Sequence, residues 1–219
     1  MKVYNNKINL FFRLKSNCKK EWSDYVNHRF LKDLALDKLP IAKFRKYLLQ
    51  DFLFLQEFIR ILSLSSFKSQ NYEDMNRSID FIIAIKHELK LHINFCKKWG
   101  VSLKQLKKIQ PLKANSAYTS YVLKVGINRE NLDLFTCLAP CIIGYGEIGA
   151  MLLKIKNWKK SKYKDWIKMY SSKQYQTVAK NNIKYLDTLY KRSKKNNFKK
   201  LVEQFKKATL LEINFWNMI

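Results

Sequence analysis

The sequence predicts an all-α fold, and three observations support this prediction. Only 5 glycines and 3 prolines occur among the 219 residues, so few positions interrupt a helix. Apolar residues recur at helical spacings of three and four within long stretches rich in Leu, Ile, Lys and Glu. No segment has the period-two alternation or the Asn-Gly turns that are typical of strands and hairpins. The length suits a single domain over residues 1–219, and 47% hydrophobic residues supply a packed core.

Helical spacing predicts about seven to nine helices. The candidate segments in chain order are Asn9–Ala35, Ile41–Ser65, Tyr72–Gly100, Leu103–Ile109, Ser116–Gly126, Asn131–Asn157, Tyr163–Met169, Ser171–Ser193 and Asn197–Ile219. Pro40 suits the first turn of the second segment, and Gly100 suits a helix stop after a lysine-rich last turn. Pro140 lies inside the most apolar segment and removes the hydrogen bond to the carbonyl of Thr136. We therefore expect a kink or a break beside it.

The charge of the chain is +26, which points first to nucleic acid or an anionic surface. Of the 43 cations, however, 36 are lysines, whereas arginine is the usual residue for forked phosphate contacts. A lysine-rich composition is explained equally well by an AT-rich genome. Three stretches lack Lys and Arg altogether, namely Tyr47–Ile59, Glu130–Leu153 and Ala208–Ile219. We expect these stretches to be buried or specialised.

The cysteines and the apolar segments indicate in which cellular compartment the protein is expected. Four cysteines without a C-x-x-C pair are typical of reduced thiols in the cytoplasm, where we expect the protein to be. The N-terminus has no signal-peptide pattern. The longest run that is almost free of charge, Leu132–Gly146, is shorter than the roughly 20 residues that cross a bilayer. We predict no membrane span.

Three polar or reactive residues lie on apolar helix faces. Asp51 falls within the apolar stripe of its predicted helix, Cys141 lies on the stripe of the helix that contains Pro140, and Glu212 adjoins the stripe of the last helix. Burying an unpaired carboxylate costs several kcal/mol, so each acid must be paired, hydrogen-bonded, protonated or functional. Taken singly, each acid can also be a core residue bonded to a tyrosine, and the thiol a small buried hydrophobe. Taken together, they indicate a pocket for an aromatic, basic small molecule, lined by Tyr118, Tyr145 and Tyr170.

Two motifs that suggest cofactors do not have the context that they need. Gly144 to Gly149 spells G-x-G-x-x-G, but no predicted strand precedes it, so we interpret its glycines as sites where helices or a ligand approach closely. His87, Glu88 and His92 are spaced one residue too widely for a zinc-binding H-E-x-x-H, although Glu88 and His92 can pair along the helix. We predict neither a metal site nor a cofactor.

A series of motifs along the chain resembles the TenA (thiaminase II) family. In order they are Trp22, His28-Arg29-Phe30, Leu39-Pro40, Phe44, Tyr47-Leu48-Leu49-Gln50-Asp51, Ala117-Tyr118-Thr119, Leu138-Ala139-Pro140-Cys141, Tyr145-Gly146-Glu147-Ile148-Gly149, Tyr163, Trp166-Ile167, Tyr170, Glu212 and Phe215-Trp216. The resemblance covers nearly the whole chain. It implies a single-domain, haem-oxygenase-like helical bundle without haem, and a homotetramer.

The resemblance also implies a reaction. It is the hydrolytic deamination of aminopyrimidines of the 4-amino-5-aminomethyl-2-methylpyrimidine type in thiamin salvage, without a cofactor. Cys141 matches the nucleophile, Glu212 the acid/base toward the ring, and Asp51 the residue that orients the amino group. Five further positions complete the implied site: Tyr118, which assists the thiol, Tyr145 and Tyr170, which line the pocket, Phe54, at a substrate-binding position, and Phe215, which packs on the ring.

Departures from the family pattern keep alternatives open. Phe54 stands where the family usually has tyrosine, and Ile142 and Ile143 replace aromatic residues after the cysteine. The same site could cleave thiamin to pyrimidine plus thiazole, or the chain could be a non-catalytic pyrimidine- or thiamin-binding protein. A nucleic-acid binder rests on charge alone, because the aromatic residues lie on apolar stripes and are not interleaved with lysine. We predict an aminopyrimidine as the partner, and neither nucleic acid nor a membrane.

Overall fold

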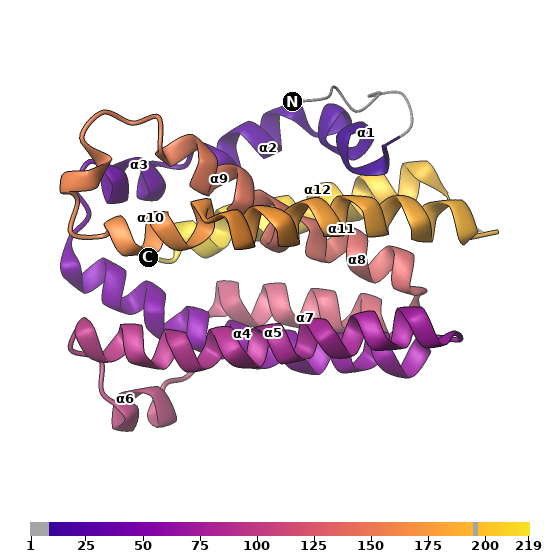
Figure 1. The fold of residues 1–219 in the computed structure, drawn as a ribbon, viewed down its shortest axis with the longest axis horizontal. Helices are drawn as coiled ribbons and strands as arrows, with labels where there is room; N and C mark the ends of the chain where they lie inside the picture. The colour runs from indigo at the N-terminus through magenta and orange to yellow at the C-terminus, as the bar shows by residue number, and fades with distance from the viewer. Residues whose placement is uncertain (1–8, 195–196) are drawn as a thin grey trace. The chain divides into compact units, whose positions relative to one another are not determined.

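The computed structural model describes residues 9–194 and 197–219. In this part of the chain all regular secondary structure is helical, which confirms the all-α prediction (Figure 1). The chain divides into two compact units. The first unit combines the N-terminal residues up to Leu39 with Phe135–Asn217, and the second combines Pro40–Leu134 with Met218–Ile219. The assignment of residues 1–219 to a single domain stays a prediction.

The second unit is built on two long helices. Its elements are α4 (Ile41–Lys68), α5 (Tyr72–Lys98), α6 (Leu103–Lys108), α7 (Lys113–Asn128) and the first turn of α8 (Asn131–Ala139). The helix α4 packs along α5 and also against α7 (Figure 1). As predicted, α4 begins directly after Pro40 and α5 ends just before Gly100, which has a φ of +72°.

The first unit contains shorter helices around a buried centre. Its elements are α1 (Leu10–Asn17), α2 (Lys19–Val26), α3 (Arg29–Ala35), the rest of α8, the π-helix η1 (Pro140–Gly144), α9 (Tyr145–Leu152), the 3₁₀ turn η2 (Trp158–Lys160), α10 (Lys164–Ser171), α11 (Lys173–Arg192) and α12 (Phe198–Asn217). The helix α12 packs against α2, α10 against α9, and both α11 and α12 against η1.

The prediction of one helix over Asn9–Ala35 is wrong. Cys18 has a non-helical backbone and separates α1 from α2. His28 then caps α3, because its ring nitrogen Nδ1 accepts a hydrogen bond of 3.2 Å from the amide of Phe30. Apolar periodicity continues through both interruptions, since the short helices all face the same core, and periodicity alone therefore did not reveal the breaks.

The predicted break at Pro140 is confirmed, and it takes the form of a π-helical turn. The helical segment ends at Leu152, five residues before the predicted Asn157, which has a left-handed φ of +68°. The predicted helix end at Asn157 is therefore wrong. Asn131–Leu152 spans 22 residues and is long and apolar enough to cross a membrane, although 83% of its most apolar part is buried inside the protein.

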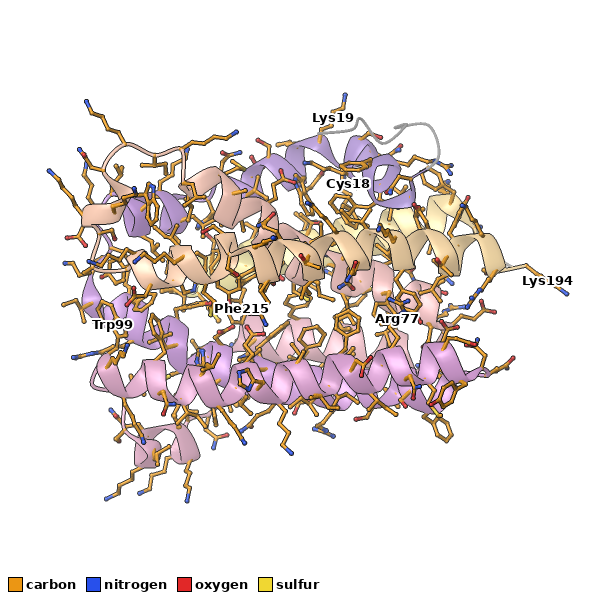
Figure 2. All side chains as sticks on the ribbon, viewed as in Figure 1. Cys18, Lys19, Arg77, Trp99, Lys194 and Phe215 are labelled. Carbon is orange, nitrogen blue, oxygen red and sulfur yellow. The ribbon has the colours of Figure 1, made fainter. Side chains whose placement is uncertain are left out.

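The cation-free stretches are mostly buried, in agreement with the prediction. Residues 132–146 are all buried, and so are Asp51 and Glu212 in the other two stretches. Lysines, in contrast, are mostly exposed, and Figure 2 shows Lys19 and Lys194 pointing away from the protein. The positive charge is therefore a property of the surface.

Candidate active site

Cys141 lies in the π-helical turn, and two tyrosines hold that turn. Pro140 has no N–H, and a π-turn shifts the backbone hydrogen bonds out of their α-helical register. The Tyr25 hydroxyl donates to the carbonyl of Pro140 at 3.2 Å, and the Tyr175 hydroxyl donates to the carbonyl of Ile142 at 3.3 Å. Single π-turns are frequent at functional sites. The turn that carries the predicted nucleophile is thus fixed on both sides by side chains of α2 and α11.

The glycines around η1 allow neighbouring elements to approach closely. A Cβ atom at Gly144 would lie 2.5 Å from the ring of Tyr25. A Cβ atom at Gly149 would lie 2.4 Å from the carbonyl carbon of Tyr170 and 2.6 Å from the amide nitrogen of Ser171. The glycines of the G-x-G-x-x-G pattern therefore allow neighbouring elements to pack closely, as expected from the sequence.

Cys141 is buried, and its thiol is hydrogen-bonded within its own turn. The residue is 8% exposed, and Sγ donates a hydrogen bond of 3.1 Å to the carbonyl of Leu138. Glu212 and Phe215 lie on α12, each 2% exposed, and α12 packs against η1. The first unit thus brings the helix that carries the predicted acid/base against the turn that carries the predicted nucleophile.

Tyr145 and Tyr170 come together in an aromatic cluster of the first unit. Their ring centroids are 4.8 Å apart. Trp166 lies 4.6 Å from Tyr170, and Trp216 lies 5.5 Å from Tyr145. The two predicted pocket tyrosines are therefore neighbours, inside a cluster that also belongs to the core.

In the second unit, Asp51 faces His92. Asp51 is 6% exposed and its Oδ2 lies 3.5 Å from His92 Nδ1, while His92 Nε2 lies 2.8 Å from the carbonyl of Leu48. Burial raises the pKa of Asp51 to about 7, although the hydrogen bond from Tyr47 acts in the opposite direction. Burial also lowers the pKa of His92 below its ordinary value. Asp51 is thus bonded to a tyrosine, as a core acid would be, but it also faces a titratable partner.

Two further titratable groups of α5 adjoin this pair. Burial, together with the charge of Asp51, raises the pKa of Glu88 to about 7 and that of Cys96 to about 12. The sequence suggested that Glu88 and His92 pair along the helix. His92 instead contacts Asp51 and Leu48 of α4. The short polar cluster of α5 is therefore turned toward the predicted site residue of α4.

Phe54 and Tyr118 are also brought together in the second unit. Their ring centroids are 5.1 Å apart, with Phe54 on α4 and Tyr118 on α7. Gln50 fixes this packing. Its Oε1 accepts hydrogen bonds from the amide of Leu112 at 2.9 Å and from Nδ2 of Asn115 at 3.1 Å. The glutamine before Asp51 therefore holds the start of α7 against α4.

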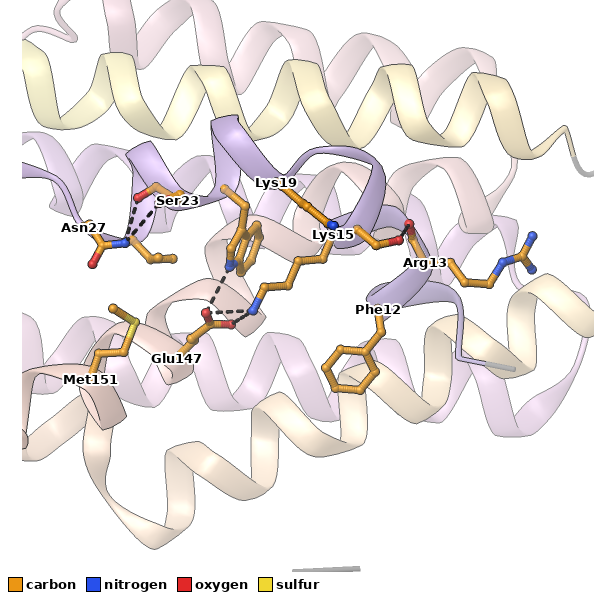
Figure 3. Close-up of a pocket in the computed structure, with 11 residues that line it drawn as sticks. Phe12, Arg13, Lys15, Lys19, Ser23, Asn27, Glu147 and Met151 are labelled. Atoms are coloured by element: carbon orange, nitrogen blue, oxygen red, sulfur yellow. Dashed lines mark hydrogen bonds and ion pairs between the residues drawn. The ribbon is translucent and has the colours of Figure 1, made fainter. Parts of the chain in front are cut away.

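A separate surface groove of about 620 Å³ lies in the first unit between α1, α2 and α9 (Figure 3). Glu147 crosses it, accepting hydrogen bonds from Lys15 at 2.7 Å and from the indole of Trp22 at 3.1 Å. None of the predicted site residues lines this groove. Glu147 therefore has a structural role, joining α9 to the N-terminal helices.

A metal site was not predicted, and within residues 9–194 and 197–219 no group of three or more His, Cys, Asp and Glu side chains could hold a metal ion. Sequence reasoning missed three residues that contact predicted site residues or their turn: His92 in the second unit, and Tyr25 and Tyr175 in the first. The position of His92 one turn after Glu88 was the only signal for it. The two tyrosines had none, since tyrosines on apolar faces are ordinary core residues.

Comparisons with known proteins agree with the motifs. The sequence model of the TENA/THI-4/PQQC family matches residues 15–219. An aminopyrimidine aminohydrolase of Helicobacter pylori is 31% identical over 207 residues, which cover 94% of this chain and 95% of that protein. A crystal structure described as a TenA family transcription regulator, from Silicibacter sp. TM1040, superposes with a TM-score of 0.88 and 33% identity, covering 95% of each chain.

The fold has wider relatives as well. A domain of unknown function from Shewanella denitrificans, described as having a heme oxygenase-like fold, matches with a TM-score of 0.75, covering 95% of this chain and 90% of that one. At 11% identity this match concerns the fold alone. It confirms the predicted haem-oxygenase-like bundle. By its sequence, its motifs and its fold, the chain belongs to the TENA/THI-4/PQQC family.

Proposed function

We propose that this protein is an aminopyrimidine aminohydrolase of thiamin salvage. The observation that carries the proposal is the set of aligned motifs, shared over nearly the full length with a relative that bears this name. The arrangement in the first unit supports it, because a cysteine in a π-helical turn, a buried glutamate on the adjacent helix and two neighbouring tyrosines suit attack on an electron-poor ring.

In the proposed reaction the Cys141 thiolate adds to the ring carbon that bears the amino group. Glu212 donates a proton to a ring nitrogen, which accepts the electron pair that the addition displaces. The proton on the ring nitrogen returns through Glu212 to the amino group, which leaves as ammonia, and a sulfur–carbon bond joins the pyrimidine to the enzyme. Water attacks the same carbon, releasing the hydroxypyrimidine and restoring the thiol. The net change is one water consumed and one ammonia released.

The remaining predicted residues have binding roles in this proposal. Tyr145, Tyr170 and Phe215 provide aromatic surfaces for the ring, as their buried positions in the first unit allow. Asp51 accepts a hydrogen bond from the amino group, and Tyr118 assists the thiol. Phe54 lacks the hydroxyl that its family position usually supplies, so we expect weaker orientation of the ring. If that loss abolishes turnover, the chain is a pyrimidine- or thiamin-binding protein.

We also propose that the chain assembles into a cytoplasmic homotetramer. The helix α5 supports self-association, since it carries large apolar side chains on its exposed surface. These are Tyr72, Met75, Ile79, Ile83 and Leu91. Their spacing of mainly three and four residues makes a continuous stripe, and exposed apolar patches of this kind commonly mark protein interfaces. Light scattering that gives a monomer mass at micromolar concentration would rule out the assembly.

An ammonia-release assay tests the function. The panel contains 4-amino-5-aminomethyl-2-methylpyrimidine, a 4-aminopyrimidine without the aminomethyl group, and thiamin. Ammonia from the first compound with unchanged thiamin supports the aminohydrolase, and thiazole released from thiamin adds the second activity. Calorimetric binding of the pyrimidine without ammonia identifies the binding protein. Absence of both binding and turnover contradicts the proposed function.

A further inference from the structure

We propose that His92 is a positioning residue for Asp51, which it holds in place and with which it shares one proton. The shared proton stays between Oδ2 of Asp51 and the His92 ring, so the other carboxyl oxygen can accept a hydrogen bond from the amino group of an aminopyrimidine. The inference rests on the proposed function in one respect, namely that Asp51 binds the pyrimidine.

The contacts of the His92 ring determine where its hydrogen lies. The carbonyl of Leu48 only accepts hydrogen bonds, so the nitrogen 2.8 Å from it, Nε2, carries a hydrogen. In a neutral ring the other nitrogen, Nδ1, then presents a lone pair, and it lies 3.5 Å from Oδ2 of Asp51. Without a further proton, two acceptors would face each other in a buried place. One proton therefore belongs to the pair.

The surroundings favour a pair without net charge. Both side chains are buried, at 6% and 8% exposure, so an isolated carboxylate is costly there. An aspartic acid with a neutral ring and a carboxylate with an imidazolium are both neutral overall, and they differ only in the position of one proton. The pair thus keeps its proton near neutral pH while the carboxyl remains able to give it to Nδ1.

The neighbouring titratable groups do not replace His92 in this role. On α5 they are Glu88, which repels a charged Asp51, and Cys96, whose thiol stays protonated. On α4 the neighbour is Tyr47, which donates to Asp51. On α7, which packs against α4, Tyr118 is buried and Lys113 and Lys124 are exposed. Glu88 also titrates near neutral pH, since its pKa is about 7, but its charge repels that of Asp51, whereas Nδ1 of the imidazole lies 3.5 Å from Oδ2 and can accept its proton.

Substitution of His92 separates its two contacts. In His92→Gln the amide nitrogen takes the place of Nε2, so the bond to Leu48 is kept while the group facing Asp51 is lost. In His92→Asn the amide takes the place of Nδ1 and faces Asp51, but it does not titrate. His87→Gln is the matched control, because His87 is exposed on the same helix. Each variant is made alone and with Cys141→Ala, so that binding is measured without turnover.

Calorimetric affinity for 4-amino-5-aminomethyl-2-methylpyrimidine is measured from pH 5 to pH 9, beside kcat and KM from ammonia release. We expect His92→Gln to remain folded and to bind about tenfold more weakly, the loss typical of a hydrogen bond to an ionisable group. The binding midpoint near pH 7 should move to lower pH, because the carboxyl loses the base that helps it hold the proton. His92→Asn should bind the pyrimidine with an affinity close to that of the parent, but its binding midpoint should still lie at a lower pH. If His92→Gln does not fold, the pH midpoint of binding in His92→Asn tests the proposal, and an unchanged midpoint contradicts it.

Unchanged affinity and midpoint in a folded His92→Gln protein would overturn the proposal, and so would equal losses in His87→Gln. The pair is also examined without substrate, by following the His92 ring in NMR titrations of the parent and of Asp51→Asn. We expect the ring titration to shift in the variant, and an unchanged titration contradicts the shared proton. If the parent neither binds nor deaminates the pyrimidine but the ring titration shifts in Asp51→Asn, the proposed function is wrong and the shared proton of Asp51 and His92 is still supported.

Discussion

Replacing Gly149 by alanine tests the close packing that supports η1. An alanine normally stabilises a helix interior by about 1 kcal/mol relative to glycine. At Gly149, however, the new methyl group would lie 2.4 to 2.6 Å from backbone atoms of Tyr170 and Ser171, where contacts of at least 3.4 Å are normal. About 1 Å of movement between α9 and the end of α10 is therefore required. Such overpacking costs about 1–3 kcal/mol, and more where only backbone can move.

We expect Gly149→Ala to lower the free energy of unfolding by about 2 kcal/mol, which corresponds to a Tm decrease of about 4–8 °C in a chain of this size. The assay is thermal unfolding followed by circular dichroism, with Gly126→Ala as the control. A Cβ at Gly126 meets only the methyl ends of Leu134 and Leu64, at 3.3 Å, and these can move aside. A Gly149→Ala protein as stable as the parent, or more stable, would refute the packing argument.

Three further predictions concern charge. Burial and Asp51 raise the pKa of Glu88 from 4.5 to about 7, so its ionisation destabilises the folded state progressively between those pH values. In urea unfolding, Glu88→Gln should therefore have a free energy of unfolding about 1–2 kcal/mol higher than the parent at pH 8, and the same value as the parent at pH 4. The full pKa shift corresponds to roughly 3 kcal/mol, but Glu88 is partly exposed, so we expect a smaller effect. Glu147→Gln should lower Tm by about 2–4 °C without changing kcat, because it removes the ion pair with Lys15. Duplex and single-stranded DNA titrated across a salt series should show no affinity at 150 mM salt, because the lysines are spread over the surface; tight binding there would restore a nucleic-acid function.

The buried residues of the candidate site were predictable because helical periodicity is a strong signal. Asp51, Cys141 and Glu212 each lie where three- and four-residue spacing places an inward face, and each is less than 9% exposed. The effect of Pro140 was also predictable, since a missing N–H has to interrupt an α-helix. That the interruption is a π-turn depends on Tyr25, more than 100 residues away in sequence. No local pattern contains that information.

The breaks in the N-terminal segment and the partner of Asp51 were not predictable for the same reason. Cys18 and His28 interrupt the helix while the apolar face continues. Burial in the core depends on which side chains face inward, and it does not require an unbroken series of backbone hydrogen bonds. His92 faces Asp51 only because α5 packs along α4, and 41 positions separate the two residues in the chain. Pairings between helices depend on their packing register, which the pattern of one helix does not specify.

The central claim is that Cys141 is the nucleophile that removes the amino group. Ammonia release from 4-amino-5-aminomethyl-2-methylpyrimidine by Cys141→Ser, compared with the parent, tests it most directly. The matched control is Cys137→Ala, which changes a buried cysteine one turn away on α8. We predict that kcat falls by a factor of at least about 100 in Cys141→Ser while the control retains most of its activity. A Cys141→Ser protein that releases ammonia at the parental rate would contradict the account.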